Sequence, residues 1–158
     1  MTANVAALDV VDALRGTGQT VAFAESLTGG LLCSTLVDVP GASDVLVGAV
    51  VAYAPEAKRD VLGVDGDQIE ENGTVHPETA AQMAQGVAKL FDATWGVATT
   101  GVAGPEPSEG KAVGTVHVAV SGPAGTQTRD LSLAGDRSMI REQTVDAALS
   151  LLVSRLSS

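Results

Sequence analysis

Residues 21–36 read VAFAESLTGGLLCSTL, and this stretch decides the fold class. Its first four residues are apolar and predict a short buried strand, whereas the segment from Leu31 to Leu36 predicts a helix. The polar and glycine-rich residues 25–30 between them are typical of a tight turn. A strand that passes through a tight turn directly into a helix is a building unit of α/β domains.

The rest of the chain continues this alternation of helices and strands. Apolar periodicity and end signals predict helices over Ala3 to Arg15, over residues 55–62, from Pro77 onward and after Asp136. Apolar or alternating runs predict strands over residues 21–24, 46–53, 94–99, 113–121 and 126–133. The last two flank a Gly-Pro-Ala-Gly turn and indicate an antiparallel hairpin. We therefore expect an α/β fold, a three-layer α/β/α sandwich with a mixed sheet containing a C-terminal antiparallel hairpin.

Composition excludes several classes of protein. The 158 residues, 45% of them hydrophobic, suit one domain over residues 1–158. Nine basic against 19 acidic residues give a net charge of −10, which disfavours nonspecific binding to nucleic acid or to an anionic membrane. One cysteine and two histidines are too few for an internal disulfide or a zinc site of several Cys and His ligands. Apolar runs fall short of a membrane span, so we expect a cytoplasmic protein.

Ser26 lies where the first predicted strand turns into a helix. Such a turn lifts the hydroxyl out of the sheet edge, and free amides of the first helical turn can bind developing negative charge. One turn could then supply both a nucleophile and an oxyanion hole. Alternatively, Ser26 or Thr28 caps the helix while Gly29 and Gly30 allow close packing, and spacing alone favours this simpler interpretation.

A serine nucleophile needs a base, and Lys58 is the better candidate. Lys58 lies on a short helix after the second predicted strand, residues 46–53, and this helix would face the same sheet edge as Ser26. Desolvation there would lower the pKa of Lys58. Tyr53 ends that strand and could relay a proton or position the lysine. Taken alone, Lys58 would be a solvated lysine and Tyr53 a half-buried strand end. His76, at a helix start, and His117, within a strand, are weaker candidates for the base.

Two further segments offer ligand-binding groups. Residues 99–105, TTGVAGP, place hydroxyls and glycine amides at the carboxyl end of a predicted strand, where ligands bind in open α/β sheets, although a plain turn is an equal alternative. Arg137 and Arg141 lie four positions apart on the last predicted helix and could hold a phosphate or carboxylate. They could equally pair with acidic neighbours, namely Asp130, Asp136 or Glu142.

Residues 104–112 imitate a phosphate-binding P-loop. Five residues instead of four separate the two glycines, and Ala112 stands where a magnesium-binding hydroxyl is required. A strand also follows where the motif needs a helix. We therefore reject this interpretation.

An ordered series of short motifs resembles a known family. The motifs are AESLTGGLL (24–32), GAVVAY (48–53) with an alanine-lysine pair after it, LGV (62–64), GTV (73–75), TTGVAGP (99–105), VGTVHVAV (113–120) and GDR (135–137). Together they resemble the C-terminal domain of the competence/damage-inducible protein family over roughly residues 5 to 155. Stand-alone members of that family act as nicotinamide-nucleotide amidases, and the chain resembles this single-domain form.

The resemblance implies hydrolysis of the carboxamide of nicotinamide mononucleotide to nicotinate mononucleotide and ammonia, without a metal or organic cofactor. It implies Ser26 as nucleophile, Tyr53 and Lys58 as base and proton relay, and amides around Leu27 and Thr28 as oxyanion hole. Glu25 would brace the turn. The remaining implied site residues are Thr28, Gly29 and Gly30 in the turn, Thr100, Gly101 and Gly104 in the ligand loop, and Arg137 and Arg141 near the substrate.

The chain departs from the family pattern at several positions. Leu27 stands for a cysteine, His76 for a serine, and residues 106–109 for a glycine-rich segment. Val45 and Leu46 replace aromatic residues, which would remove an aromatic wall from the pocket.

A competing class is a non-catalytic nucleotide-binding or protein-interaction module of the same fold. The combination of Ser26, Tyr53 and Lys58 favours catalysis, because a binding pocket has no need of a buried amine beside a hydroxyl. An exposed strand edge would also suit a homo-oligomer.

Overall fold

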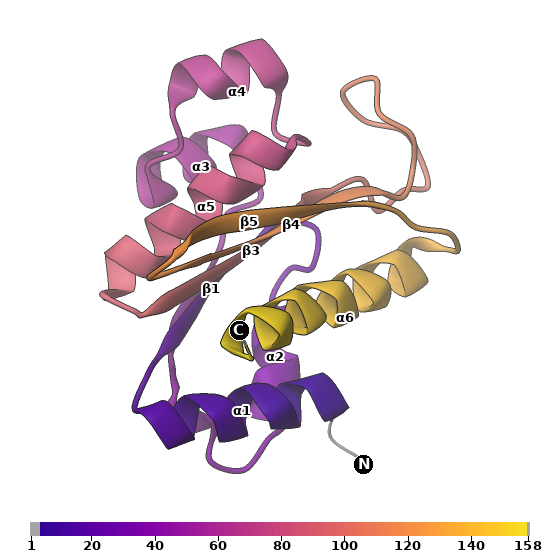
Figure 1. Cartoon of the computed structure of the whole chain (residues 1–158). Helices are drawn as coiled ribbons and strands as arrows, with labels where there is room; N and C mark the ends of the chain where they lie inside the picture. The colour runs from indigo at the N-terminus through magenta and orange to yellow at the C-terminus, as the bar shows by residue number, and fades with distance from the viewer. Residues whose placement is uncertain (1–3, 158) are drawn as a thin grey trace.

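A computed structural model describes residues 4–157 and contains one mixed sheet of five strands (Figure 1). The strands are β1 (Val21–Glu25), β2 (Leu46–Val51), β3 (Trp95–Gly101), β4 (Thr115–Gly122) and β5 (Gly125–Ser132). Their order is β2-β1-β3-β4-β5. The first three strands are parallel, while β4 runs antiparallel to β3 and forms a hairpin with β5. The predicted mixed sheet with a C-terminal hairpin is confirmed.

Helices cover both faces of this sheet. They are α1 (Val5–Thr17), α2 (Leu31–Val37), α3 (Pro55–Leu62), α4 (Gly66–Asn72), α5 (Pro77–Phe91) and α6 (Arg137–Leu156), with a short 3₁₀ turn η1 (Ala42–Asp44) before β2. Figure 1 shows α1, α2 and α6 on one side of the sheet and α3, α4 and α5 on the other. The expected three-layer sandwich is therefore present.

Side-chain size differs between the two faces of the sheet. Phe23 of β1 packs into the large apolar cluster beneath α1, α2 and α6, whereas Ala22 and Ala24 face α5. A Cβ added at Gly96 of β3 would lie 2.0 Å from the carbonyl oxygen of Ala84 in α5. Because these positions are small, α5 lies close against the sheet, which explains how a chain with 3% aromatic residues builds a dense core.

The first helix ends later than the spacing predicts. It continues through Gly16 to Thr17 and ends at Gly18, which has a left-handed φ of 67° and donates its N–H to the carbonyl of Leu14. The predicted turn over residues 16–18 is therefore wrong, because Gly18 rather than Gly16 provides the C-cap. The predicted start at Ala3 lies outside the described residues.

Other elements also differ from expectation. β2 is an edge strand rather than one covered on both faces, and its Val47 and Val51 are exposed. It ends before Tyr53, which therefore lies in the connection to α3. Leu90, expected on the buried face of α5, is 50% exposed. The short helix α4 was not predicted from the sequence, because Ile69 is its only large apolar residue and gives no helical period.

Candidate active site

The carboxyl ends of β1, β2 and β3 meet at one edge of the sheet. Parallel strands end on the same side, and open α/β sheets bind their ligands there. A pocket of about 190 Å³ opens at this edge. Its lining includes Ser26, Tyr53, Thr100, Glu106 and Arg137.

Lys58 and Ser26 meet at this pocket. The Lys58 Nζ donates to Ser26 Oγ at 2.9 Å, to the carbonyl oxygen of Ala52 at 2.7 Å and to that of Tyr53 at 3.0 Å. Lys58 is only 1% exposed. The expected contact between amine and hydroxyl is confirmed, and the alternative of a solvated surface lysine is wrong.

Burial shifts the protonation equilibrium of Lys58 toward its neutral form. Burial lowers the pKa of Lys58 from 10.5 to about 8, although the negative charge of Glu109 acts in the opposite direction. About a tenth of the amine is then neutral at pH 7. A neutral Nζ keeps two N–H groups for the two carbonyls, and its lone pair can accept the Ser26 O–H. This geometry suits a general base.

Glu25 caps the helix that follows Ser26. Its buried carboxylate accepts hydrogen bonds from the backbone N–H groups of Gly30 at 3.2 Å, Leu32 at 2.8 Å and Cys33 at 3.0 Å. The first turn of α2 offers unpaired N–H groups, which this charge satisfies. The alternative in which Ser26 or Thr28 caps α2 is therefore wrong, and the bracing role expected of Glu25 is confirmed.

Two backbone amides directly after Ser26 remain unpaired. Within residues 4–157, neither Leu27 N–H nor Thr28 N–H donates a hydrogen bond. The amide of Gly29 donates to the carbonyl of Ser26 at 3.1 Å, and the amide of Ser26 donates to Thr99 Oγ1 at 3.3 Å. Consecutive free donors next to a hydroxyl are the components of an oxyanion hole.

Arg141 holds the Ser26 turn from the outside. Its Nε donates to the carbonyl oxygen of Leu27 at 2.9 Å, and its Nη2 donates to that of Thr28 at 2.8 Å. Gly29 and Gly30 in the same turn have φ values of 56° and 103°, which residues other than glycine rarely adopt. Arg141 is not among the residues that line the pocket, so its contact with substrate stays a prediction.

Arg137 and Tyr53 lie together at the pocket wall. Arg137 donates through Nη1 to the carbonyl oxygen of Gly104 and through Nη2 to the Tyr53 hydroxyl at 3.1 Å. Among the described residues, the phenol makes no hydrogen bond to Ser26 or Lys58. A relay through Tyr53 therefore stays a prediction, whereas Lys58 contacts Ser26 directly.

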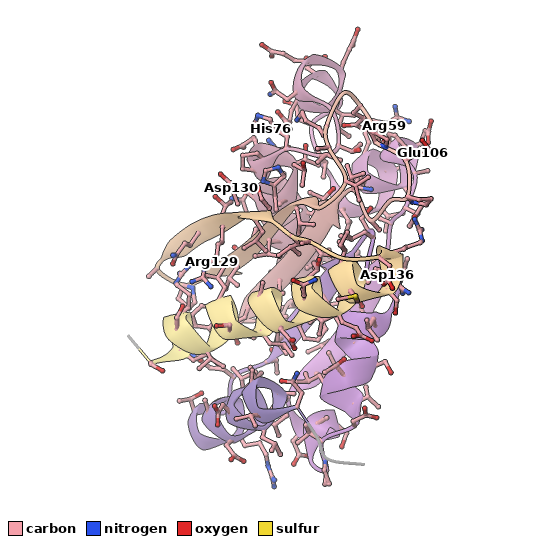
Figure 2. The ribbon with its side chains drawn as sticks, turned by 90° about the vertical axis from the view of Figure 1, so that its right-hand side faces the viewer. Arg59, His76, Glu106, Arg129, Asp130 and Asp136 are labelled. Atoms are coloured by element: carbon pink, nitrogen blue, oxygen red, sulfur yellow. The ribbon has the colours of Figure 1, made fainter. Side chains whose placement is uncertain are left out.

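The alternative pairing of the two arginines with acidic neighbours is wrong. Over residues 4–157, no ion pair joins Arg137 or Arg141 to a carboxylate. Asp136 instead caps α6 by accepting the N–H of Met139 at 2.9 Å, as the sequence predicts. Figure 2 shows Asp136 on the same side of the molecule as Glu106 of the loop between β3 and β4.

The predicted ligand loop lines the pocket through Thr100, Gly101 and Gly104. Thr100 donates its hydroxyl to the carbonyl oxygen of Thr74 at 2.7 Å, so that hydroxyl anchors the wall. A Cβ at Gly101 would lie 2.7 Å from the carbonyl oxygen of Thr115, which requires glycine there. β4 follows the loop directly, which agrees with the rejection of a P-loop.

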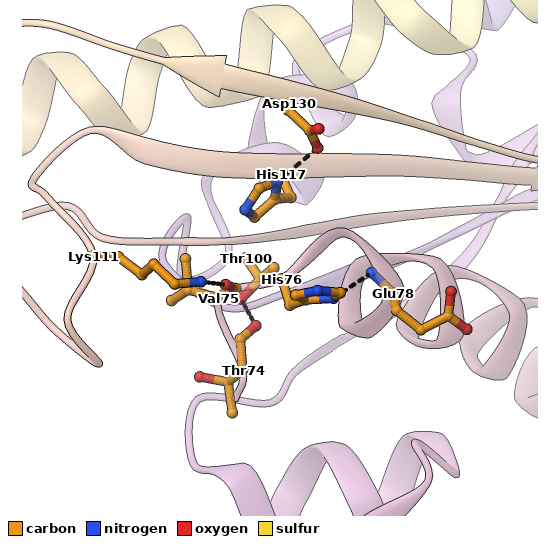
Figure 3. A network of polar contacts seen from close by, with 8 residues as sticks. All are labelled: Thr74, Val75, His76, Glu78, Thr100, Lys111, His117 and Asp130. Atoms are coloured by element: carbon orange, nitrogen blue, oxygen red, sulfur yellow. Dashed lines mark hydrogen bonds and ion pairs between the residues drawn. The ribbon is translucent and has the colours of Figure 1, made fainter. Parts of the chain in front are cut away.

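Neither histidine reaches the site. His76 accepts the N–H of Glu78 at 3.1 Å and so caps α5, while His117 on β4 contacts Asp130 on β5 at 2.8 Å (Figure 3). Their low ranking as catalytic bases is consistent with these positions.

The structure also corrects the expected loss of an aromatic wall. Val45 and Leu46 lie at the start of β2, at the opposite end of the strand from the Ser26 edge, and neither lines the pocket.

Several wall residues were missed by sequence reasoning. Glu106, Ser108, Thr74 and Val75 all line the pocket. The GTV motif and the loop after TTGVAGP were the available signals, but local spacing does not show that these two segments meet.

Neither a metal cluster nor a membrane span is found in the part of the chain that the structure describes. No group of three or more His, Cys, Asp or Glu side chains in residues 4–157 could hold a metal ion. None of the helices in that range is long and apolar enough to cross a membrane.

Known proteins match almost the whole chain. The model of the CinA C-terminal domain family matches residues 3–156. A CinA-like protein of Frankia casuarinae is 53% identical over 133 residues, which cover 84% of this chain and 31% of that protein. A CinA-like protein of Fervidobacterium nodosum is 49% identical over 134 residues, covering 84% of this chain and 33% of the other.

Solved structures agree with these sequence matches. The competence/damage inducible protein CihA from Agrobacterium tumefaciens has a TM-score of 0.92 at 36% identity, and the match covers 97% of this chain and 94% of that one. The competence damage-inducible protein A from Klebsiella pneumoniae has a TM-score of 0.93 at 31% identity, covering 96% and 95%.

The chain spans about a third of the length of the curated relatives it matches. The family model nevertheless covers residues 3–156, and the two solved structures match 97% and 96% of this chain. The chain belongs to the CinA C-terminal domain family.

Proposed function

We propose that this domain hydrolyses the carboxamide of nicotinamide mononucleotide to nicotinate mononucleotide and ammonia. The observation that carries the proposal is the 2.9 Å contact between the buried Lys58 amine and the Ser26 hydroxyl at the wall of a pocket. A buried lysine with a lowered pKa next to a hydroxyl has the chemistry of a base and its nucleophile.

The first half of the reaction forms an acyl-enzyme. Ser26 Oγ attacks the carboxamide carbon while its proton moves to the neutral Nζ of Lys58. In this proposal the oxyanion that forms accepts hydrogen bonds from the free amides of Leu27 and Thr28, and one such donor is typically worth about 3 kcal/mol. The C–N bond then breaks, and the nitrogen leaves as ammonia with the proton that Lys58 had taken.

The second half releases the acid. Water attacks the ester carbon and passes a proton to Lys58. The bond from carbon to Ser26 Oγ breaks, and Lys58 returns its proton to that oxygen. Nicotinate mononucleotide leaves, and both residues regain their starting states. The same amine serves as base and acid in each half, as microscopic reversibility requires.

A phosphate-bearing substrate is compatible with the acidic chain. The net charge of −10 is a property of the whole molecule, whereas the pocket wall carries the Arg137 guanidinium. Local cations and backbone amides decide the field that a bound anion experiences.

The test measures ammonia and nicotinate mononucleotide released by the purified protein without added metal. Ser26→Ala and Lys58→Met should each lower turnover by at least about 10³-fold, because each removes one member of a coupled pair. Ser34→Ala on exposed α2 surface and Lys89→Met on exposed α5 surface are the matched controls and should keep wild-type rates.

Turnover retained in both site variants would contradict the mechanism. Saturable binding of the nucleotide without any product in the wild type would instead identify the non-catalytic binding module.

A further inference from the structure

A strained turn lies in the loop that joins β3 to β4. Glu109 and Gly110 are its two central residues, with φ values of 53° and 73°. Ser108 and Lys111 flank them and are joined by backbone hydrogen bonds in both directions, at 3.2 and 2.8 Å. This turn geometry favours Asn, Asp or Gly at both central positions. A glutamate is unusual at such a position, and an interaction of its side chain is needed to offset the strain.

The Glu109 carboxylate binds the segment between α4 and α5. It accepts the N–H of Thr74 at 2.9 Å and the N–H of Val75 at 3.0 Å, and it also accepts the Thr74 hydroxyl. Lys111, on the other side of the turn, donates to the carbonyl oxygen of Val75 at 2.8 Å (Figure 3). The loop therefore holds both backbone polar groups of Val75.

This contact joins two parts of the wall of the pocket that Ser26 lines. Thr74 and Val75 form one part of its wall, and Glu106 and Ser108 of the loop form another. On the far side, the Thr100 hydroxyl holds the carbonyl oxygen of Thr74. The segment is thus fastened both to the sheet and to the loop.

The negative charge of Glu109 also acts on Lys58 in the site. Burial raises the pKa of its carboxyl, but hydrogen bonds from Thr74 and Val75 and the charge of Lys111 outweigh burial and lower it below the ordinary value. Glu109 is therefore ionised at neutral pH. Its charge is the one that acts on Lys58, where it raises the pKa against the effect of burial.

We propose that Glu109, together with Lys111, is a positioning residue that fastens the loop onto Thr74 and Val75 and so builds the outer wall of the Ser26 pocket. Glu109 contacts none of the reacting atoms. The expected effect on turnover rests on the amidase function proposed above, whereas the wall and its charge can be measured without substrate.

The substrate-free test compares Glu109→Gln with Glu71→Gln. The second variant makes the same charge change on an exposed position of α4. Glutamine keeps one acceptor oxygen but carries no charge, so it accepts the Thr74 and Val75 N–H groups more weakly than the carboxylate does, and Glu109→Gln should raise hydrogen exchange at these two amides by about tenfold. The chain has only three lysines, Lys58, Lys89 and Lys111, so a ¹³Cε NMR titration resolves Lys58.

Loss of the negative charge at position 109 should move the Lys58 titration midpoint to lower pH by about 0.5. Glu71→Gln should leave both readouts at their wild-type values. The proposal requires both changes in Glu109→Gln, and either change alone overturns it. Should that variant fail to fold, Lys111→Met must likewise speed exchange at Val75, and unchanged exchange there overturns the proposal.

Kinetics separate a positioning role from a general loss of structure. Where the wild type hydrolyses the nucleotide, Glu109→Gln should raise KM about tenfold and leave kcat within about threefold, because binding must then order the wall. An unchanged KM overturns the role in the wall. An inactive wild type would contradict the proposed function alone, because hydrogen exchange and the Lys58 titration still test the role of Glu109 in the wall.

Discussion

The two ends of the sheet each carry a hollow and a cation, and they differ in what that cation can do. At the carboxyl end, Lys58 is buried against Ser26 beside a pocket of about 190 Å³. At the amino end, a larger hollow of about 320 Å³ is lined by Trp95 and Arg155, whose guanidinium lies 5.6 Å from the ring centroid. Arg155 also donates to two backbone carbonyl oxygens, at 3.2 and 2.9 Å.

This difference teaches that the chemistry of the lining residues, rather than the size of the hollow, distinguishes the two ends. A guanidinium stays protonated in proteins and accepts no proton, so Arg155 can only stack and donate hydrogen bonds. A buried amine can lose its proton near neutral pH. The carboxyl end therefore combines an amine of lowered pKa, a hydroxyl and free amides, while the amino end joins the hairpin, β3 and α6.

The largest effect is expected on stability as a function of pH. The pKa of Lys58 is 10.5 when unfolded and about 8 when folded, so the unfolded chain binds more protons between these values. Wild-type stability should therefore rise with pH in that window, relative to Lys58→Met, by about 3 kcal/mol. Urea unfolding of both proteins at pH 7.5 and about pH 10.5 measures this difference. A constant difference between the two proteins would contradict a lowered pKa of Lys58 in the folded protein.

A smaller effect is expected for the residue that holds the Ser26 turn. Arg141→Gln removes the bonds to the Leu27 and Thr28 carbonyls, so the two free amides lose their fixed direction. We expect kcat to fall about tenfold, with little change in KM, because the oxyanion is bound only in the transition state. Steady-state kinetics of Arg141→Gln measure this effect, and Arg15→Gln, which changes an exposed arginine of α1, is the control variant. A change confined to KM would place Arg141 in substrate binding instead.

The smallest effect is expected at the amino end. Arg155→Met removes the contact with Trp95 and the bonds to backbone carbonyls, and should lower the free energy of unfolding by about 1 kcal/mol. Turnover should stay within about twofold of the wild type. Thermal unfolding and the ammonia assay measure the two quantities. A large loss of turnover with an intact fold would show that the amino end takes part in the reaction.

The central pair of the site could be predicted from the sequence. Ser26 and Lys58 each follow a predicted strand and were expected at the same sheet edge, where the parallel strands β1 and β2 do end. Spacing alone favoured a helix cap for Ser26 and a solvated Lys58, and the family resemblance identified them as a catalytic pair. The strand-turn-helix stretch and the C-terminal hairpin could be predicted because local hydrophobic periodicity and turn-forming residues specify them.

The groups that support the pair could not be predicted in the same way. Arg141 reaches carbonyls 113 and 114 residues away, and Glu109 reaches amides 34 and 35 residues away. Such contacts depend on tertiary packing and leave no spacing in the sequence. The cap of α2 shows the same limit, because spacing alone favoured Ser26 or Thr28 as the cap, whereas Glu25 accepts the amides of the helix.

The most direct test of the central claim is the titration of Lys58 in the wild-type protein. A ¹³Cε NMR titration, with Lys58→Met to assign the signal, gives its midpoint without any substrate. A midpoint near pH 8 is the predicted result, because burial lowers the pKa of Lys58 to about 8. A midpoint near the ordinary lysine value of 10.5 would contradict the claim that this amine can serve as the base for Ser26.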